Sequence, residues 1–418
     1  MTTSEHYDAL ETRDPGERER ELLERLARQV AHAKAHAPGF ARILKDVDPR
    51  EAGSRAALAR LPVTRKSDLK ELQASAPPLG GLNATPVEKL AKIFVSPGPI
   101  CEPEGHGRDW WRTGRALYAA GFRSGDLVTN TFAYHFTPAG SMMESAALAC
   151  GCTVLPAGVG QTEMQVATIA SLRVDGYIGT PSFLKLIVEK ADELKADIAS
   201  LKKAMVGAEY LPPALRRALG ERGLSVLQCY ATADLGLLAY ESRGPDGAVC
   251  EGMIVDEGCL LEIVRPGTGD PVPEGEVGEV VVTTFNPDYP LIRFATGDLS
   301  AVLPGASPCG RTNLRIRGWM GRADQTTKVK GMFVHPSQVA EVVKRHPEIR
   351  RARVVVDQAE GQDRMTLHCE VETASAGLAD AVVATIRELM KLRGEVRLRK
   401  PGELANDGKV IEDARKYD

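Results

Sequence analysis

The stretch GYIGTPSFLKLIVEKADEL, residues 176–194, decides the fold class. Its first five residues predict a short strand, and PSFLKLIVEKADEL (181–194) predicts a helix that begins with a proline. Strands that are linked through helices usually pair in parallel. The elements on either side of this stretch therefore decide whether a parallel sheet forms.

The alternation of strand and helix continues in both directions. Upstream, the pattern predicts strands at 126–132 and 152–158 and helices at 141–151 and 162–172. Downstream, it predicts strands at 202–209 and 225–231 with a helix at 212–222 between them. Before this region, residues 17–45 read as helical, because Leu22, Leu23, Leu26 and Val30 fall on one face. A mostly parallel sheet covered by helices on both faces is expected.

The pattern changes twice nearer the C-terminus. From about 240 to 320, CLLEIV, GEVVVTTF and LSAVLP are β-rich with Gly/Pro turns, which indicates a barrel-like or antiparallel subdomain. From 321 to 418 the pattern becomes β-α-β-β-α-β, typical of a small α+β domain. The predicted fold is α/β, with a large N-terminal domain (1–320) that includes the β-rich subdomain and a small C-terminal α+β domain (321–418).

Composition excludes several classes of protein. The 418 residues are 43% hydrophobic and carry a net charge of -3 with the two signs interspersed, so a nucleic-acid partner is not expected. The N-terminus is charged, and no run reaches the roughly 18 apolar residues of a membrane span. Eight cysteines without a CxxC pair do not predict a disulfide framework. A cytoplasmic protein is expected.

The segment AKIFVSPGPICEPEG (91–105) raises the question of a phosphate loop. Ile93, Phe94 and Val95 predict a strand that runs into a turn-rich segment, with a helical stretch expected after it. Nucleotide-using enzymes often place a glycine- and hydroxyl-rich loop at such a position. This segment offers one serine, Ser96, and no lysine after the strand.

Several motifs in order resemble one known superfamily. They are GAEYLPP (207–213), YATADLG (230–236), YPLIRFATGDLS (289–300), GRADQTTKVKGMFVHPSQV (321–339) and DGKVIEDARK (407–416). Their order and spacing resemble the adenylate-forming superfamily of acyl-CoA synthetases. LPVTRKSDLKE (61–71) and GCTVLPAGVGQTEMQVATI (151–169) are most similar to the phenylacetate–CoA ligase family. The resemblance covers nearly the whole chain.

The resemblance implies an activity with two half-reactions. A carboxylic acid attacks ATP to form an acyl-adenylate, and the thiol of CoA then displaces AMP. ATP, Mg²⁺ and CoA are implied, with an aromatic acid as substrate, and the small C-terminal domain is expected to rotate between the two steps. A homodimer is compatible with family habit.

The resemblance also assigns residues to the nucleotide and to catalysis. Asp298 would accept hydrogen bonds from both ribose hydroxyls, as a carboxylate can. Lys409 would be the catalytic cation that lets two anions approach, and Asp324 would be the hinge. The other expected nucleotide contacts are Ser96, Gly207, Ala208, Glu209, Tyr230, Ala231 and Arg322. Each of these positions has a plainer alternative as a turn, linker or surface residue.

An aromatic cluster lies where the family lines its acid pocket. The segment TFAYHFTPAG (131–140) contains Phe132, Tyr134, His135 and Phe136. Clustered aromatic side chains suit an aromatic or apolar acid. Core packing is the alternative for the same residues.

Two sites depart from the family's pattern. Where the family has Tyr-Gly-x-(Ser/Thr)-Glu, this chain has Tyr-Ala-Thr-Ala-Asp (230–234), so Asp234 is the expected Mg²⁺ ligand and Ala233 replaces a hydroxyl. In the loop, two prolines remove amide donors, and Glu102 and Glu104 would repel a triphosphate unless they bind Mg²⁺ or point away.

The remaining alternatives concern zinc and the type of activity. Cys309 in SPCGRT (307–312) lacks the second cysteine of a family zinc turn, so structural zinc is not expected. The leading interpretation is an acid–CoA ligase. The alternatives are a nucleotide- or acyl-CoA-binding protein that no longer adenylates, and an adenylating enzyme whose acceptor is not CoA.

Overall fold

The computed structural model describes residues 5–323, 327–329, 332–359, 362–407 and 409–415. The chain divides into two compact units. One comprises residues 1–261, 282–294 and 303–318, and the other comprises 262–281, 295–302 and 319–418. Each unit is described separately.

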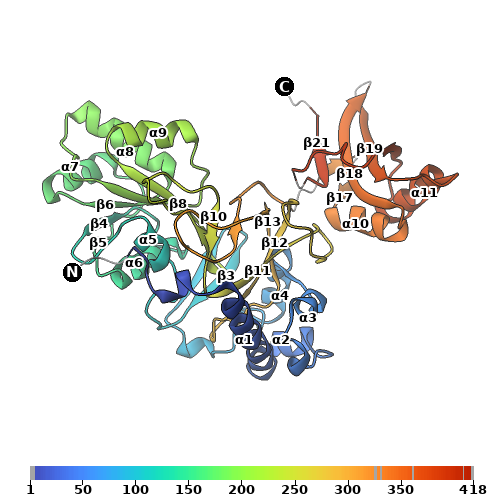
Figure 1. Cartoon of the computed structure of the whole chain (residues 1–418), viewed down its shortest axis with the longest axis horizontal. Helices are drawn as coiled ribbons and strands as arrows, with labels where there is room; N and C mark the ends of the chain where they lie inside the picture. Colours follow the sequence, from blue (N-terminus) through green and yellow to red (C-terminus); the bar gives the residue numbers. More distant parts are fainter. Residues whose placement is uncertain (1–4, 324–326, 330–331, 360–361, 408, 416–418) are drawn as a thin grey trace. The chain divides into compact units, whose positions relative to one another are not determined.

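The first unit contains a nine-stranded sheet of order β14-β15-β10-β9-β8-β7-β6-β4-β5 (Figure 1). The pairs β4–β5, β4–β6, β6–β7 and β7–β8 are parallel, whereas β8–β9, β9–β10 and β10–β15 are antiparallel. The predicted parallel core is confirmed. The strands are β4 (Leu127–Asn130), β5 (Thr153–Leu155), β6 (Gly176–Gly179), β7 (Lys203–Val206), β8 (Ser225–Thr232), β9 (Gly236–Tyr240), β10 (Met253–Val255), β14 (Val302–Leu303) and β15 (Arg315–Ile316).

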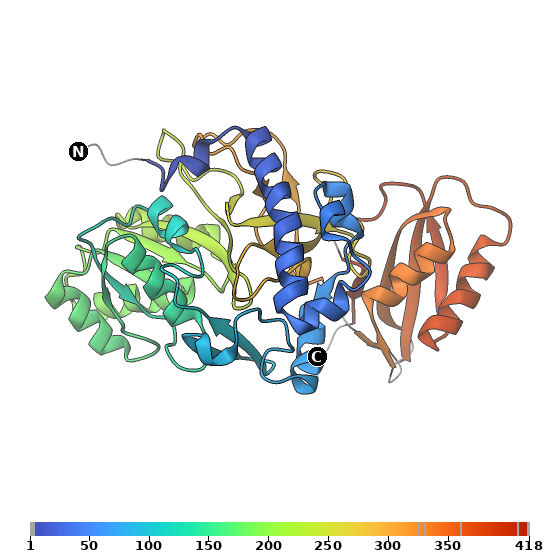
Figure 2. The ribbon, with the colours of Figure 1, turned by 90° about the horizontal axis from the view of Figure 1, so that it is seen from below.

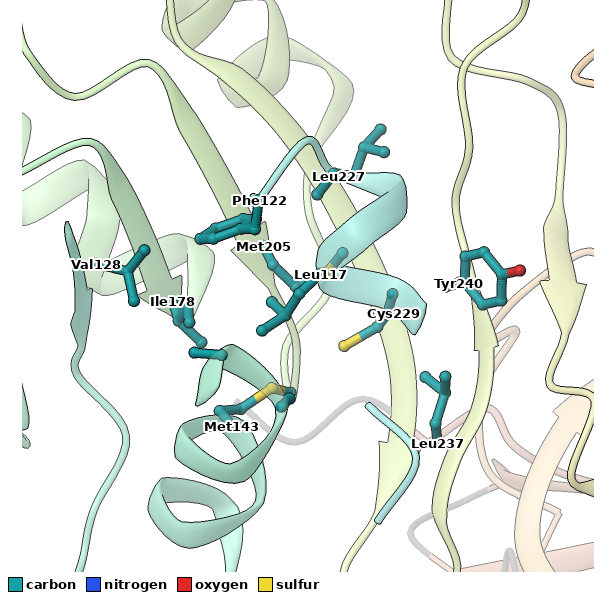
Figure 3. Packing of buried hydrophobic residues seen from close by; sticks show 14 of the residues in the cluster. Leu117, Phe122, Val128, Met143, Ile178, Met205, Leu227, Cys229, Leu237 and Tyr240 are labelled. Carbon is teal, nitrogen blue, oxygen red and sulfur yellow. The ribbon is translucent and has the colours of Figure 1, made fainter. Parts of the chain in front are cut away.

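Helices cover both faces of this sheet because its strands are apolar on both sides. Side chains alternate along β6, so that Ile178 joins one hydrophobic cluster and Tyr177 joins another. The Ile178 cluster receives α5 and α6, and the Tyr177 cluster receives α7, α8 and α9 (Figure 3 shows the former). The helices are α5 (Gly114–Ala119), α6 (Ala139–Ala149), α7 (Thr162–Leu172), α8 (Pro181–Leu194) and α9 (Pro213–Glu221).

The predicted helix at 17–45 is two helices, α1 (Pro15–His36) and α2 (Pro38–Ile43) (Figure 2 shows α1 as the long blue helix). The break falls at Ala37 because Pro38 disfavours a helical conformation at the residue before it. Leu22, Leu26 and Val30 are buried, as their spacing predicts. The other short elements of this region are α3 (Arg55–Arg60), β1 (Thr64–Arg65), α4 (Leu69–Ser75), and the 3-10 turns η1 (Ala9–Thr12), η2 (Pro49–Glu51), η3 (Lys66–Asp68) and η4 (Val87–Lys89).

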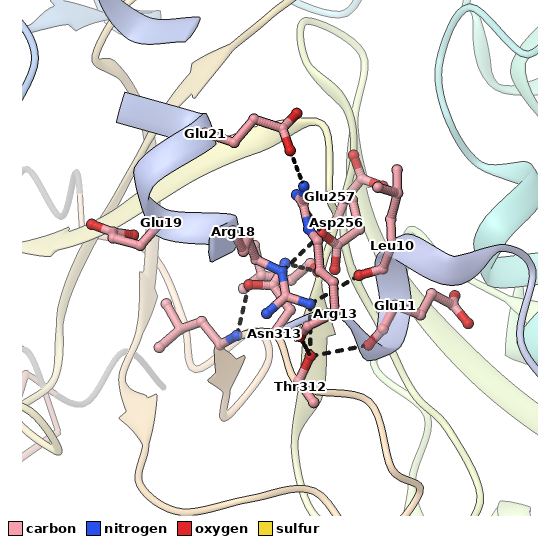
Figure 4. A network of polar contacts seen from close by, with 12 residues as sticks. Leu10, Glu11, Arg13, Arg18, Glu19, Glu21, Asp256, Glu257, Thr312 and Asn313 are labelled. Atoms are coloured by element: carbon pink, nitrogen blue, oxygen red, sulfur yellow. Dashed lines mark hydrogen bonds and ion pairs between the residues drawn. The ribbon is translucent and has the colours of Figure 1, made fainter. Parts of the chain in front are cut away.

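A buried ion cluster holds the N-terminal segment against a distant turn (Figure 4). Glu257 Oε2 accepts from Arg18 Nε at 2.9 Å and from Arg13 at 3.0 Å. Arg18 also donates to Thr312 Oγ1 at 2.8 Å and to the Leu10 carbonyl at 2.9 Å. Arg18 and Glu257 are almost fully buried, so each charge depends on the other for compensation.

The β-rich region forms a four-stranded sheet of order β1-β13-β12-β11. It consists of β1 with β11 (Cys259–Val264), β12 (Gly278–Thr284) and β13 (Phe294–Ser300). All residues of β11, β12 and β13 are buried. The expected β-rich character of this region is confirmed.

The C-terminal part of the second unit has the expected β-α-β-β-α-β order. Its sheet, β20-β19-β18-β21, is covered by α10 and α11, which share one hydrophobic cluster with it (Figure 2). The predicted strand in KVKGMFV is two strands that pair antiparallel, β16 and β17. The elements are β16 (Thr327–Val329), β17 (Met332–Val334), α10 (Pro336–Arg345), β18 (Ile349–Ala359), β19 (Gln362–Val371), α11 (Leu378–Met390), β20 (Glu395–Arg399) and β21 (Ile411–Asp413).

Candidate active site

The carboxyl ends of β7 and β8 bring several predicted nucleotide contacts to one edge of the sheet. These strands pair in parallel, with Val206 opposite Gln228. Gly207, Ala208 and Glu209 follow β7 directly. Tyr230 and Ala231 lie at the end of β8, just before its last residue, Thr232. Ligands of open α/β sheets bind beyond this edge.

The turn after β7 is held by polar contacts of its own. Ala208 has a left-handed φ of 65°, which is uncommon for a residue other than glycine. Glu209 accepts from the Ser182 amide at 3.3 Å through its carboxylate and from Gln228 Nε2 at 2.8 Å through its carbonyl. A side chain at Gly207 would place its Cβ 3.3 Å from Cys229 Sγ. This small, fixed turn is compatible with a flat ligand against the backbone.

The segment in the phosphate-loop position is the turn of a β-hairpin. Strands β2 (Lys92–Ser96) and β3 (Ile100–Glu104) pair antiparallel, with Ser96 opposite Ile100. The strand at Ile93–Val95 is confirmed, but residues 100–104, expected to be turn-rich, form the second strand, and the helix that follows, α5, begins at Gly114. The three turn residues, Pro97–Pro99, reverse the chain, so that residues 100–104 pair with β2.

The loop's hydroxyl is directed to a carboxylate. Ser96 Oγ donates a hydrogen bond to Glu102 Oε1 across the hairpin. Glu102 is fully buried, and its Oε2 has no hydrogen-bond partner among the described residues. Burial, together with the neighbouring Asp234 carboxylate, raises the pKa of Glu102 to about 7.

The predicted metal ligand Asp234 lies in the turn between β8 and β9 with a lysine beside it. Lys66 Nζ donates to Asp234 Oδ2 at 2.6 Å, and the Asp234 side chain is fully buried. Asp234 Oδ1 has no partner within the described part of the chain. The Thr232 hydroxyl accepts from the Leu235 amide at 3.1 Å, so it stabilises this turn.

A tyrosine completes this buried cluster. The Tyr289 side chain is 2% exposed, and its hydroxyl has no partner in the described structure. Burial and the carboxylates of Asp234 and Glu102 raise its pKa. Sequence reasoning assigned no role to Lys66 or Tyr289. Lys66 stands inside LPVTRKSDLKE and Tyr289 is the first residue of YPLIRFATGDLS, so both positions lie in motifs that the sequence shares with the family.

The predicted ribose ligand Asp298 and nucleotide contact Arg322 are brought together in the second unit. Arg322 donates to Asp298 Oδ1 at 2.9 Å, and the two residues form an isolated β-bridge. Trp319 Nε1 donates to the same oxygen at 3.1 Å. Trp319 is half exposed, and its indole is a further polar group that sequence reasoning missed.

The predicted catalytic lysine lies in the segment that leads into β21. Lys409 is exposed, its amide donates to Asp407 Oδ1 at 3.1 Å, and its carbonyl accepts from Arg353 Nε at 3.0 Å. The backbone at Lys409 is thus anchored while its side chain is in solvent. The predicted hinge, Asp324, lies outside the described residues.

The aromatic residues after β4 do not all face one place. Phe132 is buried in the Ile178 cluster, whereas His135 and Phe136 are exposed, Phe136 by 75%. The Tyr134 hydroxyl accepts from Asn130 Nδ2 at 2.8 Å, and burial together with Glu144 raises its pKa. An acid pocket in this segment stays a prediction.

The region of the family's zinc turn is polar. Cys309 Sγ lies 3.0 Å from Ser307 Oγ and 3.2 Å from Ser242 Oγ. Across the described residues, no group of three His, Cys, Asp or Glu side chains is arranged to hold a metal ion.

None of the described helices combines the length and apolar character needed to cross a bilayer.

Comparison with known proteins identifies the family. A family model for AMP-binding enzymes matches residues 108–286. The phenylacetate-coenzyme A ligase of Thermus thermophilus is 32% identical over 91% of this chain and 89% of its own length. This chain belongs to the phenylacetate-coenzyme A ligase family.

Other ligases agree with that membership. The phenylacetate-coenzyme A ligase of Aromatoleum evansii is 31% identical over 84% of this chain and 80% of its own length. The family to which this chain belongs is one of AMP-forming acid–thiol ligases.

Solved structures share the fold. An open conformation of 2-hydroxyisobutyryl-CoA ligase, in complex with its acyl-AMP and CoA, superimposes with a TM-score of 0.73 at 23% identity. The alignment covers 97% of this chain and 93% of that one. At this identity the likeness establishes the adenylate-forming ligase fold.

Proposed function

We propose that this family member is an ATP-dependent acid–CoA ligase that activates an aromatic, phenylacetate-like carboxylic acid. The observation that carries the proposal is the 32% identity to a phenylacetate-coenzyme A ligase across nine-tenths of both chains. The small turn after β7 and the Asp298–Arg322 pair support a nucleotide as the second substrate.

In the first half-reaction, a carboxylate oxygen of the acid attacks the α-phosphorus of ATP, and pyrophosphate leaves. Two anions must approach each other, so a cation at the reacting atoms lowers the barrier. We assign this role to Lys409, whose exposed side chain extends from an anchored backbone.

In the second half-reaction, the sulfur of CoA attacks the acyl carbon. The bond to AMP breaks, the thiol proton passes to solvent, and a thioester and AMP result.

We assign Asp298 to the ribose hydroxyls and Phe132, Tyr134, His135 and Phe136 to the acid side of the site. Residues 321–418 are proposed to move as a domain about Asp324 between the two steps.

The residues around Asp234 fit a divalent cation. Asp234 Oδ1 is a buried carboxylate oxygen without a partner in the described structure, and an ion of Mg²⁺ type binds such oxygens. When bound, Mg²⁺ neutralises charge on the phosphates of ATP. Lys66 holds the other oxygen of the same carboxylate.

One observation favours a second candidate, a nucleotide-binding protein that does not adenylate. Ser96, the hydroxyl of the loop, already donates to Glu102, and two of the three turn residues are prolines. Such a loop offers few donors to a triphosphate. The retained Lys409 favours the ligase, since a protein that only binds has no need of this cation.

An ATP–pyrophosphate exchange assay over a panel of acids tests the proposal. We expect exchange with an aryl acetate to exceed that with benzoate or a fatty acid. Product mass with and without CoA then identifies the acceptor, because a thioester appears only when CoA is the acceptor. AMP or CoA binding without exchange for any acid would refute adenylation and support the second candidate.

A further inference from the structure

Three buried oxygen atoms, one each from the hairpin β2–β3, the β8–β9 turn and the segment between β12 and β13, have no hydrogen-bond partner among the described residues. They are Glu102 Oε2, Asp234 Oδ1 and Tyr289 Oη. The Glu102 and Asp234 side chains are fully buried, and each carboxylate acts electrostatically on the Tyr289 hydroxyl. Buried oxygens of this kind normally have a partner, because desolvation without one is unfavourable.

The second oxygen of each carboxylate accepts a hydrogen bond. That hydrogen bond fixes the orientation of the carboxylate and therefore the position of its unpartnered oxygen. Ser96 Oγ donates to Glu102 Oε1, and Lys66 Nζ donates to Asp234 Oδ2 at 2.6 Å. Each carboxylate is therefore oriented by one donor and keeps one lone-pair oxygen available. Preorientation by such outer contacts is characteristic of metal-binding carboxylates.

Charge balance favours a cation as the missing partner. When both are ionised, Glu102 and Asp234 bring two negative charges into a buried region, and Lys66 supplies one positive charge. A neutral ligand does not compensate the second negative charge, so Glu102 would have to take up a proton instead. A divalent cation satisfies both oxygens and compensates the charge.

The number of protein ligands agrees with Mg²⁺ that is shared with a nucleotide. Mg²⁺ is usually held by one or two carboxylates and completes its octahedron with phosphate oxygens and water. The described residues contain no larger group of metal-ligating side chains. Two carboxylates with one oxygen each are what this mode of binding needs.

We propose that Glu102 is a second protein ligand, together with Asp234, of the divalent cation that accompanies ATP, and that Lys66 is a positioning residue for Asp234. This inference rests on the proposed function. It accounts for both departures from the family's pattern. The loop has exchanged hydroxyls for Pro97 and Pro99, which close a hairpin in which Glu102 pairs with Phe94. The cluster around Phe94 receives Ala231, three residues before the shortened carboxylate of Asp234.

The test is a titration of the full-length protein with Mn²⁺ alone, followed by electron paramagnetic resonance of the free ion. We expect one site in the parent protein. Glu102→Gln and Asp234→Asn should each weaken Mn²⁺ binding by at least about 10-fold. Glu104→Gln is the matched control, because Glu104 is buried on the same strand but its oxygens are paired with Lys92 and Ser141.

The outcomes separate this inference from the proposed function. Mn²⁺ binding that is unchanged in Glu102→Gln, or absent from the parent both with and without ATP, overturns the metal site. Equal loss in Glu104→Gln also overturns it, since the effect would then be structural. Intact Mn²⁺ binding with no ATP–pyrophosphate exchange refutes adenylation and leaves the metal site standing. Circular dichroism of each variant confirms that it is folded.

Discussion

Asp109 makes the stability of the protein depend on pH. Its Oδ2 accepts from the Gly114 amide at 2.9 Å, but its Oδ1 is buried and has no partner in the part of the chain that the structure describes. Burial and the Asp256 carboxylate raise the pKa of Asp109 from 3.8 to about 6. The folded protein therefore holds a proton at this position that the unfolded chain releases at lower pH.

The sign of the effect follows from this difference in proton binding. Between pH 3.8 and 6 the folded state binds more protons than the unfolded state, so the free energy of unfolding falls as pH rises. A shift of about 2 units corresponds to about 3 kcal/mol at 1.36 kcal/mol per unit, and partial solvation reduces this to about 2 kcal/mol. The penalty is absent below pH 3.8 and complete above pH 6.

Asp109→Asn removes the charge and keeps a side chain that tolerates the left-handed φ of 48° at this residue. Relative to the parent, we expect the variant to gain about 1.3 kcal/mol in its free energy of unfolding between pH 4.5 and pH 7.5, because about a third of the full penalty is already present at pH 4.5. Urea unfolding at each pH is followed by tryptophan fluorescence, since Trp110 and Trp111 adjoin the site.

The control is Asp46→Asn, because the Asp46 side chain is 88% exposed and its removal should change stability equally at both pH values. A difference between Asp109→Asn and parent that does not grow with pH would refute the reasoning. So would a variant that loses stability at pH 7.5.

Three further predictions concern other parts of the molecule. Glu257→Gln should lower the free energy of unfolding by about 3–5 kcal/mol, because the buried Arg18 loses its counter-charge, and urea unfolding measures this loss. Lys409→Ala should slow acyl-adenylate formation by orders of magnitude while thioester formation from supplied adenylate survives. Equal loss of both steps would contradict the role assigned to this lysine. Ser96→Ala should change adenylation modestly and lower stability by about 1–3 kcal/mol, because Glu102 loses its donor. A loss of several orders of magnitude in exchange would instead make Ser96 a phosphate ligand.

The sequence predicted the α/β core well because the signals for each helix and strand lie within that element. The helix boundaries at 162–172 and 181–194 agree with α7 and α8, where an apolar periodicity and a proline at the first turn act within one element. The segment after Pro99 was misread because β3 is stabilised by pairing with β2 rather than by any periodicity of its own.

The sequence by itself determined the order of strands and helices, the family and the motifs that family shares, since each is carried by residues that are close along the chain. Only the tertiary structure decided that Lys66, Glu102, Asp234 and Tyr289, which come from separate segments, share one buried cluster. It also separated buried Phe132 from exposed Phe136, four residues away. Burial and charge compensation depend on which segments pack together, and no property of a single segment specifies that.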